Sequence, residues 1–206
     1  MITKGDDYPI HQTPEPVAYT GAHRNFYDQI FFNGYDRSGD VFFAAAMGVY
    51  PYVNVLDGAF SVVLDGVQHN VYGSRVLHME RLDTRVGAIS VHIEARAEVL
   101  RVVCDDKDNG VSADLTFRYF TAAHEEPRFT RRVGTQVMMD VTRMTQFGAW
   151  TGWLEVKGRR IEVTPEAFRG CRDRSWGIRT IGQGDPQSNP YGGSPQFYWL
   201  WAPLRA

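Results

Sequence analysis

The sequence is poor in cysteine and has no long hydrophobic run. Only two of its 206 residues are cysteines, Cys104 and Cys171, and nothing in their spacing indicates a disulfide framework. No apolar run approaches the ~20 residues that a membrane-spanning helix needs, and the first residues contain no apolar core of a secretory signal. We therefore expect a cytoplasmic protein without a membrane span, in which both thiols are free.

The chain also lacks an excess of charge of one sign. Lysine and arginine together number 22 and aspartate and glutamate 24, so the formal net charge is −2. Such a balance gives no general attraction for nucleic acid or for an anionic membrane surface. The six histidines show no metal-site spacing, and no glycine-rich nucleotide-binding motif follows a predicted strand. The sequence therefore predicts no nucleic-acid partner and no metal site.

What the sequence does contain is a long series of strand-like segments. Short β-rich runs alternate with turns at a spacing of about 8–12 residues, which is typical of antiparallel barrels and sandwiches. Asp65-Gly66 is the clearest turn, because Asp-Gly between β-rich runs favours a type I′ hairpin. We expect a loop over 125–132 and a short helical turn over 164–168. Strands are predicted over residues 25–35, 41–50, 59–64, 67–72, 88–95, 97–105, 111–121, 135–142, 146–156, 161–163 and 197–201.

Two units follow from this pattern. Residues 1–24 are polar and proline-containing and predict an extended N-terminal arm, whereas residues 25–206 predict a single all-β domain. Its fold class is an antiparallel lipocalin-like (calycin) barrel or a strongly curved sandwich. The aromatic content of 13% favours a barrel with a ligand-sized interior, and aromatic side chains that simply fill the core are the alternative. The chain ends on an apolar segment, which indicates a homodimer or the N-terminal half of a longer two-domain protein.

The segment 170–179 combines arginines with an indole. If it is a strand, Arg172, Arg174 and Trp176 share one face, and Asp173 lies on the other. A buried arginine can hold a carboxylate, enol or ketone oxygen and stabilise developing negative charge. This arrangement points to the polar end of a binding pocket.

Charged groups beside a large aromatic ring are costly to bury unless they are paired. The arginines therefore either lie at a barrel mouth or meet a carboxylate, such as that of Glu155 or Asp140. A purely structural arginine–carboxylate pair that closes the barrel end, with Trp176 as a plug, is the alternative.

A second aromatic group lies over residues 147–153. We favour Trp153 as a residue that lines the interior, because its neighbours on the same strand face are small. Phe147, Trp150 and, from the last predicted strand, Tyr198 join it as candidate ligand contacts. Ordinary core and surface aromatics are the alternative.

The segment 170–179 reads G-x-x-D-x-S-W-G-x-R and is followed by the aromatic run FYWLW at 197–201. Together they resemble the AttH-like and carotenoid 1,2-hydratase (hydroxyneurosporene synthase)-like group of lipocalin-related proteins, which also includes fungal Diels–Alderases and kievitone hydratase-type enzymes. The resemblance implies two lipocalin-like domains, of which this chain holds the first. It also implies apolar substrates such as isoprenoids and polyketides, without a metal or an organic cofactor.

The chain departs from the hydratases of that group at two places. Their motif reads Asp-His-x-Trp-Gly, with the His and Trp implicated in acid–base chemistry on an alkene. Here Trp176 is kept, but Arg174 stands at the His position, and Tyr198 is not followed by the group's Asp. An arginine, with a pKa above ~12, is a poor proton donor at neutral pH. Hydration by the hydratase route is therefore doubtful.

The predicted function is binding of an apolar small molecule, such as an isoprenoid, polyketide or lipid, in the barrel. A cofactor-free isomerisation, cyclisation or hydration would accompany it if the protein is an enzyme. A non-catalytic lipid carrier and a structural half-barrel that packs on a second domain or subunit are the alternatives. On this reasoning Arg174→Ala weakens ligand binding with little loss of fold. The candidate catalytic residues are Asp173, Arg174 and Trp176, and the candidate ligand-binding residues are Trp153, Trp150, Phe147, Tyr198 and Arg172.

Overall fold

The computed structural model describes residues 7, 23–78, 80, 82–180, 198, 200 and 202. Regular structure in these residues is almost entirely antiparallel β-strand, and no helix among them is long and apolar enough to cross a membrane. The strands are β1 (Phe26–Tyr35), β2 (Val41–Tyr50), β3 (Val55–Leu64), β4 (Val67–Val76), β5 (Arg85–Val86), β6 (Ile89–Ala95), β7 (Val99–Asp106), β8 (Val111–Tyr119), β9 (His124–Glu125), β10 (Phe129–Val133), β11 (Gln136–Val156), β12 (Arg159–Val163) and β13 (Arg169–Ile178).

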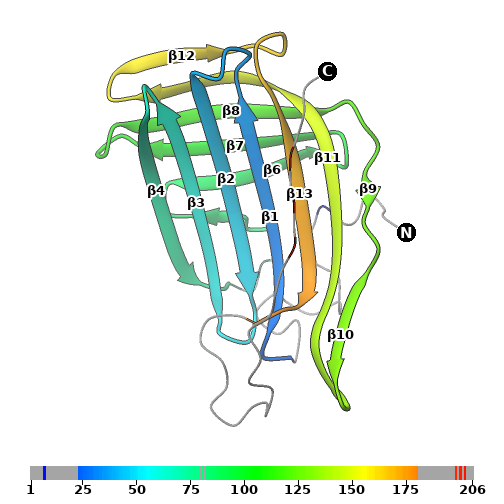
Figure 1. Ribbon diagram of the computed structural model, residues 1–206. Coiled ribbons are helices and arrows are strands. Elements are labelled where there is room, and N and C mark those ends of the chain that lie inside the picture. Colours follow the sequence, from blue (N-terminus) through cyan, green and yellow to red (C-terminus); the bar gives the residue numbers. More distant parts are fainter. Residues whose placement is uncertain are drawn as a thin grey trace.

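The strands form one sheet that curves into a nearly closed barrel. Its order is β4-β3-β2-β1-β13-β11-β8-β7-β6-β5, and Figure 1 shows the β7–β6 side folding behind the β1–β4 side. The gap between the end strands is bridged by Arg75 on β4. Its guanidinium donates hydrogen bonds to the carbonyls of Arg85 (2.6 Å) and Asp83 (2.9 Å). This side chain therefore ties the two edges together where backbone pairing stops, and the predicted all-β barrel is confirmed.

Strand β11 is the longest element and joins the two sides of the barrel. Its residues 140–149 pair with β13, and its residues 148–156 pair with β8. The short strands β9, β10 and β12 also pair with it. Two predictions are wrong here: the segments 135–142 and 146–156 form a single strand, and the expected loop over 125–132 contains β10 and the end of β9.

The hairpins predicted at the start of the chain are confirmed. β1 and β2 pair around the turn at residues 36–40, and β3 and β4 pair around Asp65-Gly66. The φ angles of Asp65 and Gly66 are 52° and 76°, as a type I′ turn requires. Residues 165–167 form a turn in which the Phe168 amide donates to the Thr164 carbonyl (2.9 Å), in agreement with the predicted helical turn.

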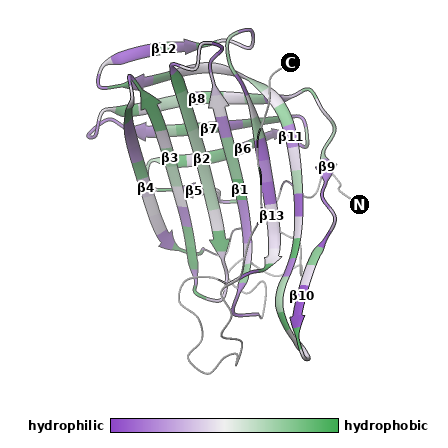
Figure 2. Cartoon of the chain, viewed as in Figure 1, coloured by the Kyte–Doolittle hydropathy of each residue, from purple (hydrophilic) through white to green (hydrophobic). Residues whose placement is uncertain are grey.

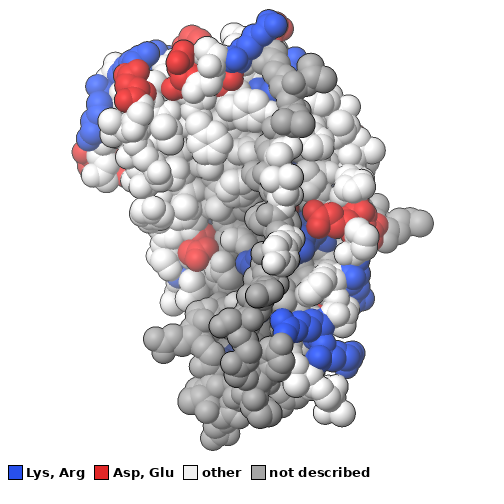
Figure 3. Space-filling model, in the orientation of Figure 1, with Lys and Arg blue, Asp and Glu red and all other residues white. Residues whose placement is uncertain are grey.

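Hydrophobic and charged side chains are distributed unevenly over the barrel. Figure 2 shows β2 and β3 as largely hydrophobic strands, whereas β12 and β10 are mostly hydrophilic. In the face seen in Figure 3, charged side chains gather at the end that carries β12 and along one side. Exposed ion pairs such as Arg159–Asp65 (2.7 Å) occupy that end. The buried residues of β1, β2, β3 and β8 form the core inside.

The chain ends lie mostly outside the described residues. Of the predicted arm over 1–24, the structure describes only residues 7, 23 and 24. Of the predicted strand over 197–201, it describes Tyr198 and Leu200, neither of which lies in a strand. Their side chains are 95% and 88% exposed, and at these two positions the prediction of a final strand is wrong.

Candidate functional site

Strand β13 brings two arginines into the barrel. It lies between β1 and β11, and Arg174 stands opposite Ile30 on one neighbour and Met144 on the other. Arg172 is 0% exposed and Arg174 is 3% exposed. The predicted alternation is therefore correct for these residues, since the alternate residues of the strand point to the same side.

Arg174 is held by an acidic residue of the neighbouring strand. Both carboxylate oxygens of Asp28 accept from Nη2 of Arg174, at 2.8 and 2.9 Å. Nη1 of Arg174 donates to the backbone carbonyl of Asp7 (2.8 Å), and the ring centroid of Trp176 lies 5.9 Å from the guanidinium carbon. Burial lowers the pKa of Arg174 from its usual value, and the charge of Asp28 opposes that shift. The ion pair between Asp28 and Arg174 therefore lies inside the barrel.

Arg172 has a second acidic partner. Its Nη1 lies 2.5 Å from Oδ1 of Asp7 and donates to Oε1 of Gln146 (3.3 Å), and the ring centroid of Tyr119 lies 5.6 Å from its guanidinium carbon. The other carboxylate oxygen of Asp7 accepts from the backbone amide of Ala97 (2.5 Å). Asp7 thus links β13 to the turn between β6 and β7.

The predicted partners of these arginines were wrong. Asp140 instead accepts two 2.6 Å hydrogen bonds from Arg128, and Glu155 pairs in register with Arg160 on β12. The idea that carboxylates meet the arginines was correct, but the carboxylates come from Asp28 and Asp7. Asp28 did leave a signal in the sequence, because it interrupts the apolar face that Phe26, Ile30 and Phe32 form. Asp7 left none.

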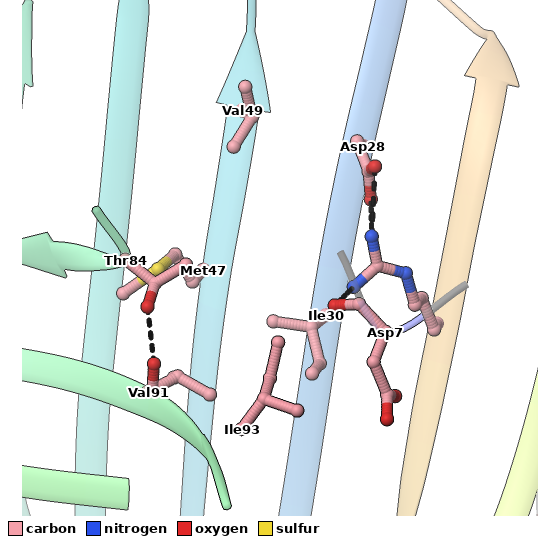
Figure 4. Close-up of a pocket in the computed structure, with 9 residues that line it drawn as sticks. Asp7, Asp28, Ile30, Met47, Val49, Thr84, Val91 and Ile93 are labelled. Carbon is pink, nitrogen blue, oxygen red and sulfur yellow. Dashed lines mark hydrogen bonds and ion pairs between the residues drawn. The ribbon is translucent and has the colours of Figure 1, made fainter. Parts of the chain in front are cut away.

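A small cavity adjoins the Asp28–Arg174 pair. Figure 4 shows Asp28 and Asp7 at one side, Val49, Met47, Thr84 and Val91 at the other, and Ile30 and Ile93 between them. The centre of a water molecule can reach about 30 Å³ of this space, and a single water needs about 10–15 Å³ by the same measure. The cavity therefore has room for one or two waters. Its lining residues are Asp7, Asp28, Ile30, Met47, Val49, Thr84, Val91, Ile93 and Arg174.

Further along the interior, aromatic rings fill the barrel. The indole of Trp150 is 0% exposed and packs on Phe117, Phe43 and Phe32, with centroids 4.6, 5.1 and 5.7 Å away. Its Nε1 donates to the Asn33 carbonyl (2.8 Å). At this end the alternative that aromatics simply fill the core is the one the structure favours.

The glycine that opens the 170–179 motif has a packing role beside Trp150. A Cβ at Gly170 would lie 1.9 Å from the Asn33 carbonyl oxygen and 2.6 Å from Nε1 of Trp150. Only a residue without a side chain fits between them. Part of the motif therefore serves the core.

The other predicted ligand contacts lie away from the cavity. Trp153 is on the opposite face of β11 from Trp150, where Arg160 stacks 4.2 Å from its ring centroid, so the prediction that it lines the interior is wrong. Phe147 is 37% exposed, and Tyr198 is almost fully exposed. The structure thus brings together Arg172, Arg174 and Trp176 but none of these three aromatics. Sequence reasoning missed Tyr119, although it alternates with Leu115 and Phe117.

Asp173 lies on the outer face of β13. Burial, and then the charge of Glu126, raise its pKa from 3.8 to about 6. Asp173 does not line the cavity, and it lies on the opposite strand face from Arg174 and Trp176, the other two candidate catalytic residues. Its catalytic role stays a prediction.

The remaining reactive groups are inert or dispersed. Cys104 and Cys171 are free and buried, as expected, and burial raises the pKa of each thiol to about 12. Within the described part of the chain, no three His, Cys, Asp or Glu side chains cluster in a way that could hold a metal ion.

Comparisons with known proteins place the chain in a family. Residues 2–206 match the model described as "Family of unknown function (DUF8625)", so the chain belongs to that family. No curated protein matches it.

Two solved structures share its fold. Kievitone hydratase from Nectria haematococca is 14% identical, with a TM-score of 0.57 over 82% of this chain and 53% of that one. CghA with Sch210972 is 15% identical, with a TM-score of 0.50 over 74% of this chain and 46% of that one. The chain spans about half the length of these proteins. At such identities the likeness shows the fold, and it confirms the predicted lipocalin-like barrel.

Proposed function

Because the family has no assigned function, we propose from the site itself that the chain binds an apolar small molecule in the barrel, and that Arg174 meets the ligand's polar group. One observation carries the proposal: a buried arginine, paired with Asp28, forms the polar side of an otherwise largely apolar cavity. Ligand sites commonly combine apolar walls with a few convergent polar groups.

The ion pair supports a binding role better than a structural one. Burying two charges costs several kcal/mol for each ion, and well-packed apolar residues in their place are often as stabilising or more so (by ~1–4 kcal/mol). The Asp28–Arg174 pair therefore contributes little stability that apolar side chains in its place could not provide. What it does add is an oriented cation beside a cavity.

The size of the cavity sets a condition on binding. Its present volume suits one or two waters, whereas drug-sized ligands occupy roughly 300–1,000 Å³. The residues that line the cavity include Met47, whose unbranched side chain adapts readily, and Asp7, which comes from outside the sheet. We propose that these two side chains shift when the ligand enters.

Catalysis is the second candidate, and Asp28 favours it. Its carboxylate lines the cavity, where it can accept a proton from a ligand while Arg174 stabilises negative charge on an oxygen. This pairing would suit a cofactor-free isomerisation or cyclisation. The proposal also includes membership of the AttH-like group and an activity related to the hydratase for which one structural neighbour is named.

The binding proposal is tested with Nile red, a neutral apolar dye, in fluorescence titrations of the full chain. Val49 lines the cavity, so Val49→Phe should weaken the affinity by about tenfold. Val67→Phe is the matched control, because Val67 is 55% exposed on β4. Thermal unfolding checks that both variants fold. Equal affinity of the two variants would show that the dye binds elsewhere and would refute the proposed site.

A further inference from the structure

Arg172 has more hydrogen-bond donors than its surroundings satisfy. Its side chain is fully buried, yet Nε and Nη2 find no acceptor among the described residues. The same holds for Nε of Arg174 and for the hydroxyl of Tyr119, both close to Arg172. Buried donors without partners cost free energy, and most native proteins hold few of them. Oδ1 of Asp7, an acceptor, also lacks an aligned hydrogen bond, although it lies 2.5 Å from Nη1 of Arg172. Donors and acceptor are therefore poorly matched in this site.

The acidic partner of Arg172, Asp7, also accepts hydrogen bonds from other groups. Asp7 touches Arg172 through one oxygen and uses the other for the Ala97 amide, while its carbonyl accepts from Arg174. The contact to Arg172 is made to Nη1 alone, so the Nε and Nη2 donors stay empty. Two adjacent nitrogens of a guanidinium suit a bidentate carboxylate.

We infer that the ligand is an apolar carboxylic acid, whose carboxylate displaces Asp7 as the anionic partner of Arg172 and binds the guanidinium through Nε and Nη2. This inference rests on the proposed function and names its ligand class. It explains why Arg172 keeps two free donors next to a position that already holds a carboxylate. Tyr119 supplies a further donor to the incoming acid.

Charge balance in the buried site requires the ligand's carboxylate to replace that of Asp7 rather than to be added to it. Among the described residues, two buried guanidinium groups, of Arg172 and Arg174, now face two carboxylates, of Asp7 and Asp28. A third carboxylate would leave an uncompensated negative charge in the interior, which is strongly unfavourable. Departure of Asp7 keeps the count equal.

Exchange also enlarges the cavity. Asp7 is one of its walls (Figure 4) and contacts Arg172, which does not line it. When Asp7 leaves, the cavity extends to Arg172 and Tyr119. The ligand's carboxylate then lies at the arginines, and its apolar body follows the wall formed by Ile30, Val91 and Met47.

The test compares cis-parinaric acid with its methyl ester in fluorescence titrations of the full chain. Asp7→Asn removes the competing charge but keeps an acceptor for the Ala97 amide. It should tighten binding of the acid by about tenfold and change binding of the ester by less than about threefold. Asp65→Asn is the matched control, because Asp65 also pairs with an arginine but is exposed. It should alter neither affinity.

Three results decide the matter. If Asp7→Asn leaves the acid's affinity unchanged or tightens acid and ester equally, the carboxylate inference is overturned while binding in the barrel stands. If neither molecule binds any form of the protein, the proposed function itself fails. Should Asp7→Asn not fold, the wild-type chain decides, because the acid must then bind at least about fivefold more tightly than the ester.

Discussion

The strongest quantitative consequence of the structure concerns the Asp28–Arg174 pair. Replacing Arg174 by methionine keeps most of the volume but removes the cation. The side chain of Asp28 is 5% exposed, so its carboxylate would stay buried and lose its pairing with Arg174. Breaking a buried pair in this way typically costs about 3–5 kcal/mol. Since whole domains are stable by only about 5–15 kcal/mol, Arg174→Met should come close to unfolding the protein.

Removing both charges should restore most of the loss. In the double variant Asp28→Leu/Arg174→Met the two apolar side chains pack where the ions lay, and no charge is stranded. We expect a free energy of unfolding within about 1 kcal/mol of the wild type or above it. The coupling energy between the two sites should therefore be about 3 kcal/mol or more, in contrast to the less than about 1 kcal/mol of an exposed pair such as Arg159–Asp65.

Urea unfolding of the wild type, both single variants and the double variant measures this coupling, with tryptophan fluorescence as the signal. The same cycle on Arg159 and Asp65 serves as the control. A cost below about 1 kcal/mol for Arg174→Met would mean that water reaches Asp28, and the buried site would be refuted. This result would instead support the expectation from sequence that losing Arg174 has little effect on the fold.

Three further predictions concern residues that do not line the cavity. The pKa of Asp173 is about 6 in the folded chain and 3.8 without burial, so the folded state binds the extra proton between these values. Stability should then fall by up to about 3 kcal/mol as the pH rises from 4 to 7, and Asp173→Asn should abolish that fall in urea melts. Gly170→Ala, which forces a Cβ against the Asn33 carbonyl, should cost about 3 kcal/mol in the same assay, and a neutral effect would contradict the packing. Iodoacetamide at pH 8 should label Cys104 and Cys171 only after unfolding, as mass spectrometry can determine, because burial raises both pKa values to about 12.

Local signals in the sequence were enough to predict the hairpins. The Asp65-Gly66 turn and the strand over 41–50 follow from neighbouring residues, and the structure has both. Strand β11 was not predictable in this way. It runs unbroken from residue 136 to 156 because β13, β10, β9 and β8 pair along it. The β10 pairing is a local hairpin, but the pairings with β13 and β8 join more distant parts of the chain.

The site shows the same division. Strand alternation predicted that Arg172 and Arg174 share a face, which needs no knowledge of neighbours. Their partners depend on which strands lie side by side. Asp28 is 146 residues from Arg174 in sequence and reaches it only because β1 pairs with β13. The spacing of residues in the sequence does not reveal which strands are neighbours. The predicted partners, Asp140 and Glu155, were therefore wrong.

Both faces of β13 bury polar groups, and the two faces differ in what they adjoin. On the outer face, Asp173 has a raised pKa and Ser175 is buried, but neither lines the described cavity. On the inner face, Arg174 lines the cavity. Arg172 lies two residues earlier on the same face of the strand and contacts Asp7. A ligand needs both volume and unsatisfied donors, and only the inner face offers the two together. The 170–179 segment therefore points to binding through its arginines, whereas its aspartate lies on the other side of the strand.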